Sequence, residues 1–159
     1  MALKTIVVSV AGAPDSLVTV KYAIYLAKLL SLKLFAIYVV NDRVLQELLR
    51  SRIFVEVEAR AYERDLEQQG RVFLERIKKL ADSKAVEFEG MLLKGVVSDE
   101  VILKTKELNA DILIMGELKE LTSRAEVFYN EGERIFRKSP CPVLVVKNPA
   151  AVENLFKEI

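Results

Sequence analysis

The stretch Asp111-Ile112-Leu113-Ile114-Met115-Gly116 is a short apolar run that ends at a glycine. A run without polar alternation is typical of a strand that is buried on both faces of a parallel sheet. Three similar runs also end at breaker segments: 4–10 before Ala11-Gly12, 33–40 before Asn41-Asp42, and 86–93 before Lys94-Gly95. Open parallel sheets bind ligands beyond the carboxyl ends of their strands, where glycine lets the backbone approach a phosphate. The glycine positions therefore indicate a nucleotide-type crevice.

Helical patterns alternate with these strands. Apolar residues recur at three- and four-residue spacing in 14–30 and 58–81, and shorter helices are predicted at 99–108, 130–138 and 152–159. A fifth strand is predicted at 143–146. Because right-handed crossovers join the strands of such an alternation, we expect a single α/β domain over residues 1–159. Its expected core is a five-stranded, parallel, doubly wound sheet in the order 3-2-1-4-5, with helices on both faces and a short extra helix at the end.

Several local features stay open or rest on capping patterns. Residues 43–50 predict a helical turn or two, and 53–57 fit either strand or helix. Gly70 costs a helix on the order of 1 kcal/mol, and the sequence offers no reason for it. Ser98 is predicted as the N-cap of the 99–108 helix, and Asn130-x-x-Glu133 resembles a capping box. The apolar stripe of the last helix covers either a partner subunit or its own sheet.

Composition excludes several classes of function. The chain has 159 residues, 52% of them hydrophobic and 30% charged, with a formal net charge of +1. This charge gives no electrostatic case for nucleic acid or a membrane surface. No apolar run approaches the about 20 residues that cross a bilayer, and no signal peptide is visible. A single cysteine, Cys141, excludes an internal disulfide and fits a reducing cytoplasm, where we expect the protein to act.

The chain contains no histidine. It therefore has no Ser-His or Cys-His nucleophile pair and no imidazole ligand for a metal ion. Acid–base chemistry near neutral pH would need carboxylates, lysines or tyrosines with shifted pKa values. We find no such constellation, so we expect no catalytic residues and no metal site.

The common nucleotide motifs of this architecture are also missing. The first strand is followed by Gly12 alone, where a dinucleotide-binding site needs G-x-G-x-x-G, and no P-loop string exists. A phosphate-accepting receiver domain would carry acidic residues where Ala11 and Lys94 stand. A flavodoxin would have a hydroxyl-rich loop in place of 11–16. The absence of these motifs excludes the common nucleotide-binding and phosphate-accepting proteins that share this architecture.

Four segments resemble motifs of the universal stress protein family, and the match spans residues 3–147. The opening Ile6-Val7-Val8-Ser9-Val10-Ala11-Gly12-Ala13-Pro14-Asp15-Ser16 is similar to the family's I-L-V-P-V-D-G-S-P-x-S. Gly95-Val96-Val97-Ser98-Asp99-Glu100-Val101-Ile102 resembles its G-x-P-x-x-x-I element. Asn109-Ala110-Asp111-Ile112-Leu113-Ile114-Met115-Gly116 is close to G-A-D-L-I-V-M-G, and Ser139-Pro140-Cys141-Pro142-Val143-Leu144-Val145-Val146 is close to A-P-C-P-V-L-V-V.

Members of this family that bind ATP carry G-x2-G-x9-G-[ST] after the fourth strand. A gapless count from Gly116 places Lys119, Tyr129 and Asn130 at the later motif positions, and the family's adenine-side Asp is Ala11 here. A phosphate cradle needs bare backbone N–H groups, and the side chains of Lys119 and Tyr129 add bulk beside them. Tyr129 either fills this space or stacks on a base. The resemblance thus implies the branch of the family that does not bind ATP in the usual manner.

Two functions follow from the resemblance. The first is a non-catalytic, cytoplasmic stress-response or regulatory protein that works as a homodimer without a cofactor. The alternative is an adenine-nucleotide-binding protein that takes ATP or AMP through a rearranged phosphate loop. Its binding residues would be Val10, Ala11, Val39, Met115, Gly116, Lys119 and Asn130.

The last strand is the expected dimer interface. In the resembling family this edge strand pairs with its two-fold mate in many dimers, and an exposed apolar edge otherwise promotes aggregation. The interface residues would be Val143, Leu144, Val145 and Val146. Cys141, which lies between two prolines and has no histidine to activate it, is expected to be an inert packing residue. Other protein partners are not indicated.

Overall fold

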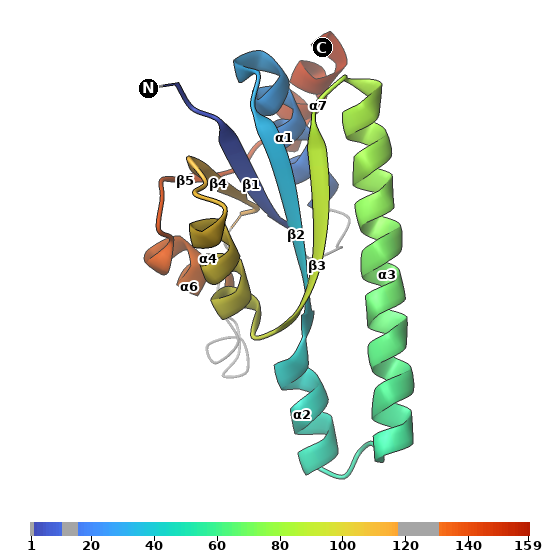
Figure 1. The fold of residues 1–159 in the computed structure, drawn as a ribbon. Helices are drawn as coiled ribbons and strands as arrows, with labels where there is room; N and C mark the ends of the chain where they lie inside the picture. The colour runs from blue at the N-terminus through green and yellow to red at the C-terminus, as the bar shows by residue number, and fades with distance from the viewer. Residues whose placement is uncertain (1, 11–15, 118–130) are drawn as a thin grey trace.

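A computed structural model describes residues 2–10, 16–117 and 131–159 of the chain. Its centre is a parallel sheet of five strands in the order β3-β2-β1-β4-β5 (Figure 1), which confirms the predicted fold class and strand order. The strands are β1 (Thr5–Val10), β2 (Lys33–Asn41), β3 (Phe88–Gly95), β4 (Ile112–Met115) and β5 (Val143–Val145).

Helices cover both faces of the sheet because successive side chains of a buried strand point to opposite sides. Ile6 and Val8 pack with the helices of one face, whereas Val7 packs with those of the other, and all three are fully buried. The first face carries α1 (Ser16–Leu30), α3 (Glu56–Ser83) and α7 (Pro149–Glu158), and the second carries α4 (Val97–Glu107) and α6 (Glu131–Lys138).

The start of β1 is tied to the start of β4 by one carboxylate. Asp111 Oδ2 accepts hydrogen bonds from the backbone N–H groups of Lys4 at 2.7 Å and Thr5 at 2.9 Å. These two bonds favour the charged carboxylate and hold the pKa of Asp111 below its ordinary value. The aspartate of the G-A-D-like segment therefore fixes the register of the central strands.

The segment that the sequence left open forms a helical hairpin. The Asn41 side chain caps α2 (Asp42–Arg50) by accepting a hydrogen bond from Arg43 N–H at 3.0 Å. Residues 51–55 form the connection, so Val57 is helical and Ile53 belongs to neither helix nor strand. At 28 residues, α3 is about 42 Å long, and its first turns project with α2 beyond the carboxyl end of the sheet (Figure 1).

Gly70 has a packing role that its sequence context did not reveal. A Cβ atom at this position would lie 2.7 Å from Leu92 Cδ1 and 2.8 Å from Tyr38 Cδ1. The glycine therefore lets α3 lie directly on the side chains of β2 and β3. This close approach offsets the loss of helix propensity that glycine brings.

The last helix covers its own domain. Val152 and Phe156 of α7 are buried in the core of the α1 face, and Lys21 of α1 bonds to both carboxylate oxygens of Glu153 at 2.8 and 2.9 Å. Of the two alternatives left by the sequence, the structure shows packing on the chain's own fold. Among the helices of the described residues, none combines the length and apolar character that a membrane span requires.

Candidate functional site

The carboxyl edge of the sheet brings several of the predicted nucleotide residues together. Val10 ends β1 and Met115 ends β4, and these two strands are neighbours. The chain leaves β1 toward β2 on one side while β4 lies on the other, so the strand order reverses between β1 and β4. Ligands of open α/β sheets bind at this point. Val10 and Met115 are buried, and Gly116 follows directly after Met115.

Val39 lies near the end of β2 and packs on the α4 face together with Met115. The predicted residues Ala11, Lys119 and Asn130 lie outside the described residues, as does Tyr129. The predicted capping box also falls there in part, because it begins at Asn130. The other residue of that box, Glu133, is described, and its Oε1 accepts a hydrogen bond from Arg137 Nε at 2.9 Å within α6.

Gly116, the glycine that retains the family motif, lies against α1. A Cβ atom at this position would be 3.2 Å from Thr19 Oγ1, which is tighter than an ordinary contact. Thr19 is itself buried in the first half of α1. A side chain at position 116 would therefore require Thr19 to shift by a few tenths of an ångström.

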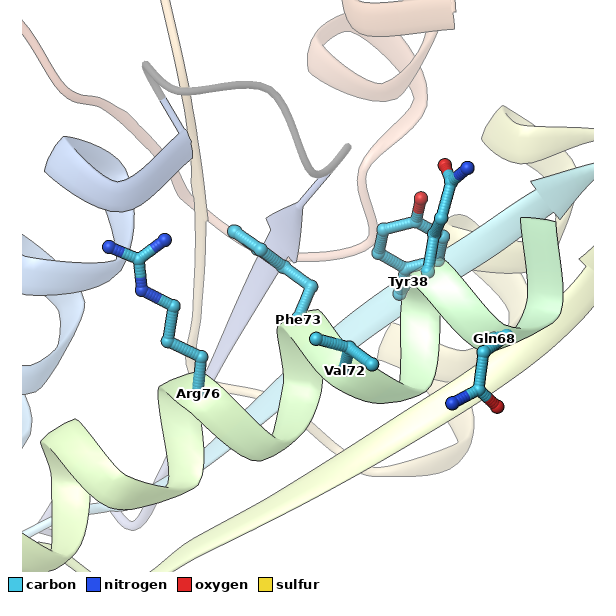
Figure 2. Close-up of a pocket in the computed structure, with 6 residues that line it drawn as sticks. Tyr38, Gln68, Val72, Phe73 and Arg76 are labelled. Atoms are coloured by element: carbon cyan, nitrogen blue, oxygen red, sulfur yellow. The ribbon is translucent and has the colours of Figure 1, made fainter. Parts of the chain in front are cut away.

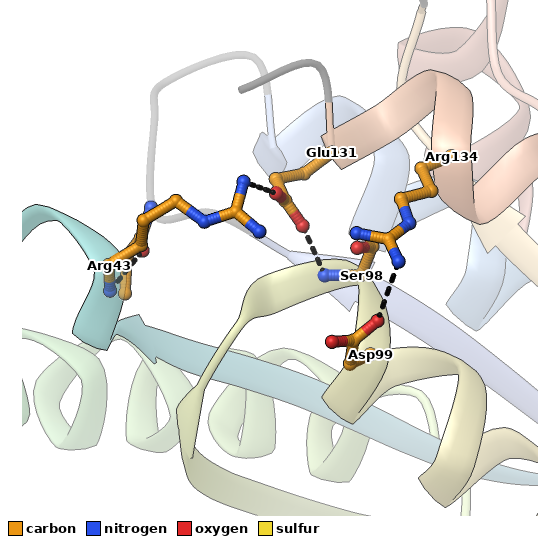
Figure 3. Close-up of polar contacts among 6 residues, drawn as sticks. Arg43, Ser98, Asp99, Glu131 and Arg134 are labelled. Carbon is orange, nitrogen blue, oxygen red and sulfur yellow. Dashed lines mark hydrogen bonds and ion pairs between the residues drawn. The ribbon is translucent and has the colours of Figure 1, made fainter. Parts of the chain in front are cut away.

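The start of α4 is capped by a residue from another helix. Glu131, the first residue of α6, accepts a hydrogen bond through Oε2 from the Ser98 backbone N–H (Figure 3). The N-cap residue Val96 has no side-chain oxygen that could serve this purpose. The prediction that Ser98 caps the helix is wrong: α4 begins at Val97, one residue before Ser98. The Ser98 hydroxyl is buried and makes no hydrogen bond within the described part of the chain.

Arg43 of α2 braces the same carboxylate. Its Nη1 lies 3.4 Å from Glu131 Oε1, and the Glu131 side chain is only 15% exposed (Figure 3). A second ion pair joins α6 to α4, with Arg134 Nη2 3.3 Å from Asp99 Oδ1, but both of its side chains are largely solvated. Three helices are thus linked through polar side chains beside the carboxyl edge of the sheet.

The network also sets the charge at the start of α6. Glu131 and Glu133 both lie in the first turn of that helix. Helix N-termini attract anions through exposed N–H groups and the helix dipole, and carboxylates in the first turn counter this attraction for a second anion. By the gapless count, this helix follows the family's phosphate loop directly. The described residues therefore place two carboxylates in the first turn of α6.

A separate groove lies on the α1 face of the sheet. It has a volume of about 340 Å³ and is lined by Tyr38, Gln68, Gln69, Val72, Phe73 and Arg76. Phe73 lies between Arg76 at one end and Tyr38 at the other (Figure 2), and the two rings are 6.3 Å apart. Burial raises the pKa of Tyr38 above its ordinary value. Because Tyr38 and Val39 point to opposite faces of β2, this groove is distinct from the α4 side of the crevice.

Cys141 has the environment of a structural thiol. It packs against the core of the α4 face, and burial raises its pKa above the ordinary value. Its sulfur lies 3.7 Å from Ser139 Oγ. A raised pKa lowers the fraction of reactive thiolate at neutral pH.

The sequence missed Glu131 and Arg43 as interacting residues. The two are 88 positions apart, and Glu131 is 33 positions from Ser98. One feature of the sequence does point to such a partner. The residue at the N-cap of α4 is Val96, whose side chain cannot accept a hydrogen bond, so the helix needs an acceptor from elsewhere in the chain. The acidic start of α6 supplies the missing acceptor.

A parallel sheet of this order, with helices on both faces, defines an open, doubly wound α/β domain. The chain belongs to the universal stress protein family, whose sequence profile matches residues 2–147. Universal stress protein MJ0531 of Methanocaldococcus jannaschii is 30% identical over 150 residues, which cover 92% of this chain and 83% of that protein. The resemblance inferred from the sequence is thereby confirmed, and so is the assignment to a family of stress-response proteins.

Solved structures agree on the fold. Hypothetical protein MJ0577 superposes with a TM-score of 0.75 at 21% identity, over 93% of this chain and 98% of the other. A universal stress protein in complex with cAMP superposes with a TM-score of 0.64 at 22% identity, over 92% of this chain and 98% of the other. A universal stress protein from Archaeoglobus fulgidus in complex with dAMP superposes with a TM-score of 0.64 at 15% identity, over 92% of this chain and 100% of the other.

Proposed function

We propose that this universal stress protein is a non-catalytic regulatory protein of the cytoplasm that does not bind ATP in the usual manner of its family. The observation that carries the proposal is the position of Glu131. Its carboxylate bonds to the N-terminus of α4, is braced by Arg43, and places a negative charge at the first residue of α6. A triphosphate at the start of α6 would meet that charge.

The sequence of the motif positions supports the same conclusion. Lys119 and Tyr129 replace motif glycines, and Ala11 replaces the adenine-side aspartate. Gly116, the retained glycine, also has a close packing contact with Thr19 of α1. The absence of histidine and of any recognisable catalytic constellation in the sequence supports a role without chemistry.

Equilibrium dialysis against ATP, ADP and AMP tests this proposal. We expect no retention of ATP at micromolar concentrations. A family member that keeps G-x2-G-x9-G-[ST] serves as the positive control. Micromolar retention of ATP by the present chain, competed by unlabelled ATP, would refute the proposal.

We propose further that the protein is a homodimer through β5. Leu113 N–H donates to Pro142 O and Val146 N–H donates to Met115 O, so the pattern of a parallel ladder leaves the N–H groups of Val143 and Val145 facing outward. Within the described residues, β5 has β4 as a neighbour on one side and no strand on the other. Pairing with a second copy would satisfy this edge.

Val145→Pro removes one outward donor while leaving the bonds to β4 intact. We expect this variant to lose the dimer in sedimentation velocity and to keep its far-UV circular dichroism. An unchanged mass in a folded variant would argue against the β5 interface.

The second candidate function is adenine-nucleotide binding. It is favoured by the position of Val10, Met115 and Gly116 at the strand-order reversal, and by the relatives of the same fold that are described in complex with cAMP and dAMP. A ligand with a single phosphate makes smaller demands on the altered loop than ATP does. Retention of AMP or cAMP but not ATP in the dialysis experiment, or an adenine nucleotide in native mass spectra of the purified protein, would support this candidate.

A further inference from the structure

We infer that the tip of the α2–α3 hairpin is a contact surface for a second copy of this chain. The tip patch consists of three β-branched apolar residues that are far more exposed than their type favours: Ile53 at 63%, Val55 at 62% and Val57 at 77%. They fall within five consecutive positions at the end of a hairpin that projects past the sheet (Figure 1). Contiguous exposed apolar side chains with a polar rim mark interaction sites.

The local conformation turns these residues outward. Phe54 packs back onto Tyr62 of α3, with ring centroids 5.5 Å apart in an edge-on arrangement. Ile53 and Phe54 N–H both donate to Leu48 O, so the chain turns sharply after α2, and Ile53 and Val55 are exposed on either side of the half-buried Phe54. Val57 follows in the first turn of α3. Elsewhere, the exposed pair Leu29 and Leu30 lies at the end of α1, and Leu103 lies on α4.

The charges around the tip patch are self-complementary. Arg50 and Arg52 precede it, Glu56 lies between Val55 and Val57, and Glu58 follows in the first turn of α3. Glu58 accepts a bond from Val55 N–H, whereas Arg50, Arg52 and Glu56 form no ion pair within the described residues. A two-fold contact places the same patch on both copies. Apolar residues then meet apolar residues, and the basic side of one tip faces the acidic side of the other.

This arrangement favours a second copy over other occupants. An anionic membrane surface would attract Arg50 and Arg52 but repel Glu56 and Glu58, and a partner of one charge sign would meet the same conflict. The tip also leaves the last strand free. Because α3 covers β2 and β3 while β5 lies at the opposite edge of the sheet, both contacts can form in one assembly.

Removing the apolar side chains tests the contact without disturbing the core. The variant is Ile53→Ser/Val57→Ser, and the matched control is Leu29→Ser/Leu103→Ser, which removes two side chains that are 61% and 52% exposed. Sedimentation velocity over a concentration series reports assembly mass. We expect the tip variant to halve the limiting mass, or to weaken the last association step about tenfold or more, and the control to match the wild type.

Combination with Val145→Pro separates this inference from the proposed β5 dimer. If both contacts exist, each variant alone gives a dimer and the combined variant gives a monomer. If the β5 contact does not exist, Val145→Pro behaves as the wild type while the tip variant alone becomes monomeric. The inference would be overturned if the tip substitutions left association unchanged both in the otherwise wild-type chain and in the Val145→Pro chain. That result would also be obtained if the tip bound a different protein.

Charge reversal provides an independent test. Arg50→Glu and Glu56→Arg should each weaken tip-mediated association, because in a contact between two identical copies each substitution makes both 50–56 pairings repulsive. An equimolar mixture of the two variants should restore association. In a two-fold contact between one copy of each, the carboxylate introduced at position 50 meets the guanidinium introduced at position 56, and the other side keeps its original Arg50–Glu56 pair. With folding confirmed by circular dichroism, a mixture that associates no better than either variant alone would contradict a two-fold contact between tips.

Discussion

The Glu131 carboxylate at the start of α6 accepts a hydrogen bond from the Ser98 backbone N–H at the start of α4, so one helix supplies the cap of another. Arg43 of α2 approaches the second oxygen of the same carboxylate. One side chain thus joins three elements beside the crevice, and it does so at the helix terminus that follows the family's phosphate loop. The connection links the stability of this edge of the fold to the charge at the start of α6.

Glu131→Ala should destabilise the protein by about 1–2 kcal/mol, because it leaves a helix N-terminal N–H without its acceptor and removes a carboxylate that braces a partly buried arginine. Urea denaturation at neutral pH measures the change. Glu107→Ala, which removes an exposed carboxylate paired with Lys104, is the control and should cost about 0.5 kcal/mol or less. Equal effects of the two substitutions would show that the cap contributes little.

Gly70→Ala should destabilise the protein although alanine is the better helix former. The added Cβ atom would meet Leu92 and Tyr38 at distances below 3 Å, so α3 or these side chains must shift. We expect a cost of about 1–3 kcal/mol from overpacking, reduced by about 1 kcal/mol of helix propensity. Chemical denaturation checks the value. If the variant proved more stable than the wild type, α3 would not lie on β2 and β3 as described.

The contribution of Asp111 should depend on pH. Its pKa is lowered in the folded protein by hydrogen bonds from Lys4 and Thr5, so the stabilisation is present above the unfolded-state pKa of about 3.9 and is lost as pH falls through the lower folded value. The stability gap between the wild type and Asp111→Asn should therefore be constant from neutral pH to about pH 5 and shrink below about pH 4.

Urea titrations across this range measure the gap, with Asp65→Asn on the exposed face of α3 as a control. A gap between the wild type and Asp111→Asn that did not change with pH would show that the charge of Asp111 plays no part in holding β1 to β4.

Cys141 should react slowly with a thiol reagent. Burial raises its pKa, so little thiolate is present at neutral pH, and the thiol lies against the core. We expect labelling by a chromogenic disulfide to be at least about tenfold slower than in urea-unfolded protein and to accelerate as pH rises. Fast labelling of the folded protein would instead indicate an accessible, activated cysteine.

The fold was predictable because each strand and helix is marked by a pattern within its own short stretch of sequence. Apolar runs such as 111–116 identify buried strands, and the alternation with helices leaves few topologies. The cap of α4 was not predictable, because Ser98 offers a plausible local cap and the true acceptor is 33 residues away. Gly70 likewise makes sense only when Tyr38 and Leu92 are seen beneath it. Ile53 and Val57 were ambiguous because β-branched residues suit a strand, whereas here they form an exposed tip.

Isothermal titration of ATP into the wild type and into Lys119→Gly/Tyr129→Gly/Glu131→Gln tests the central claim most directly, because it asks whether the two loop side chains and the carboxylate at the start of α6 exclude the triphosphate. We predict no saturable heat with the wild type and measurable binding once both motif glycines are restored and the charge of Glu131 is removed. Micromolar ATP binding by the wild type, with the same affinity in the triple variant, would contradict this claim.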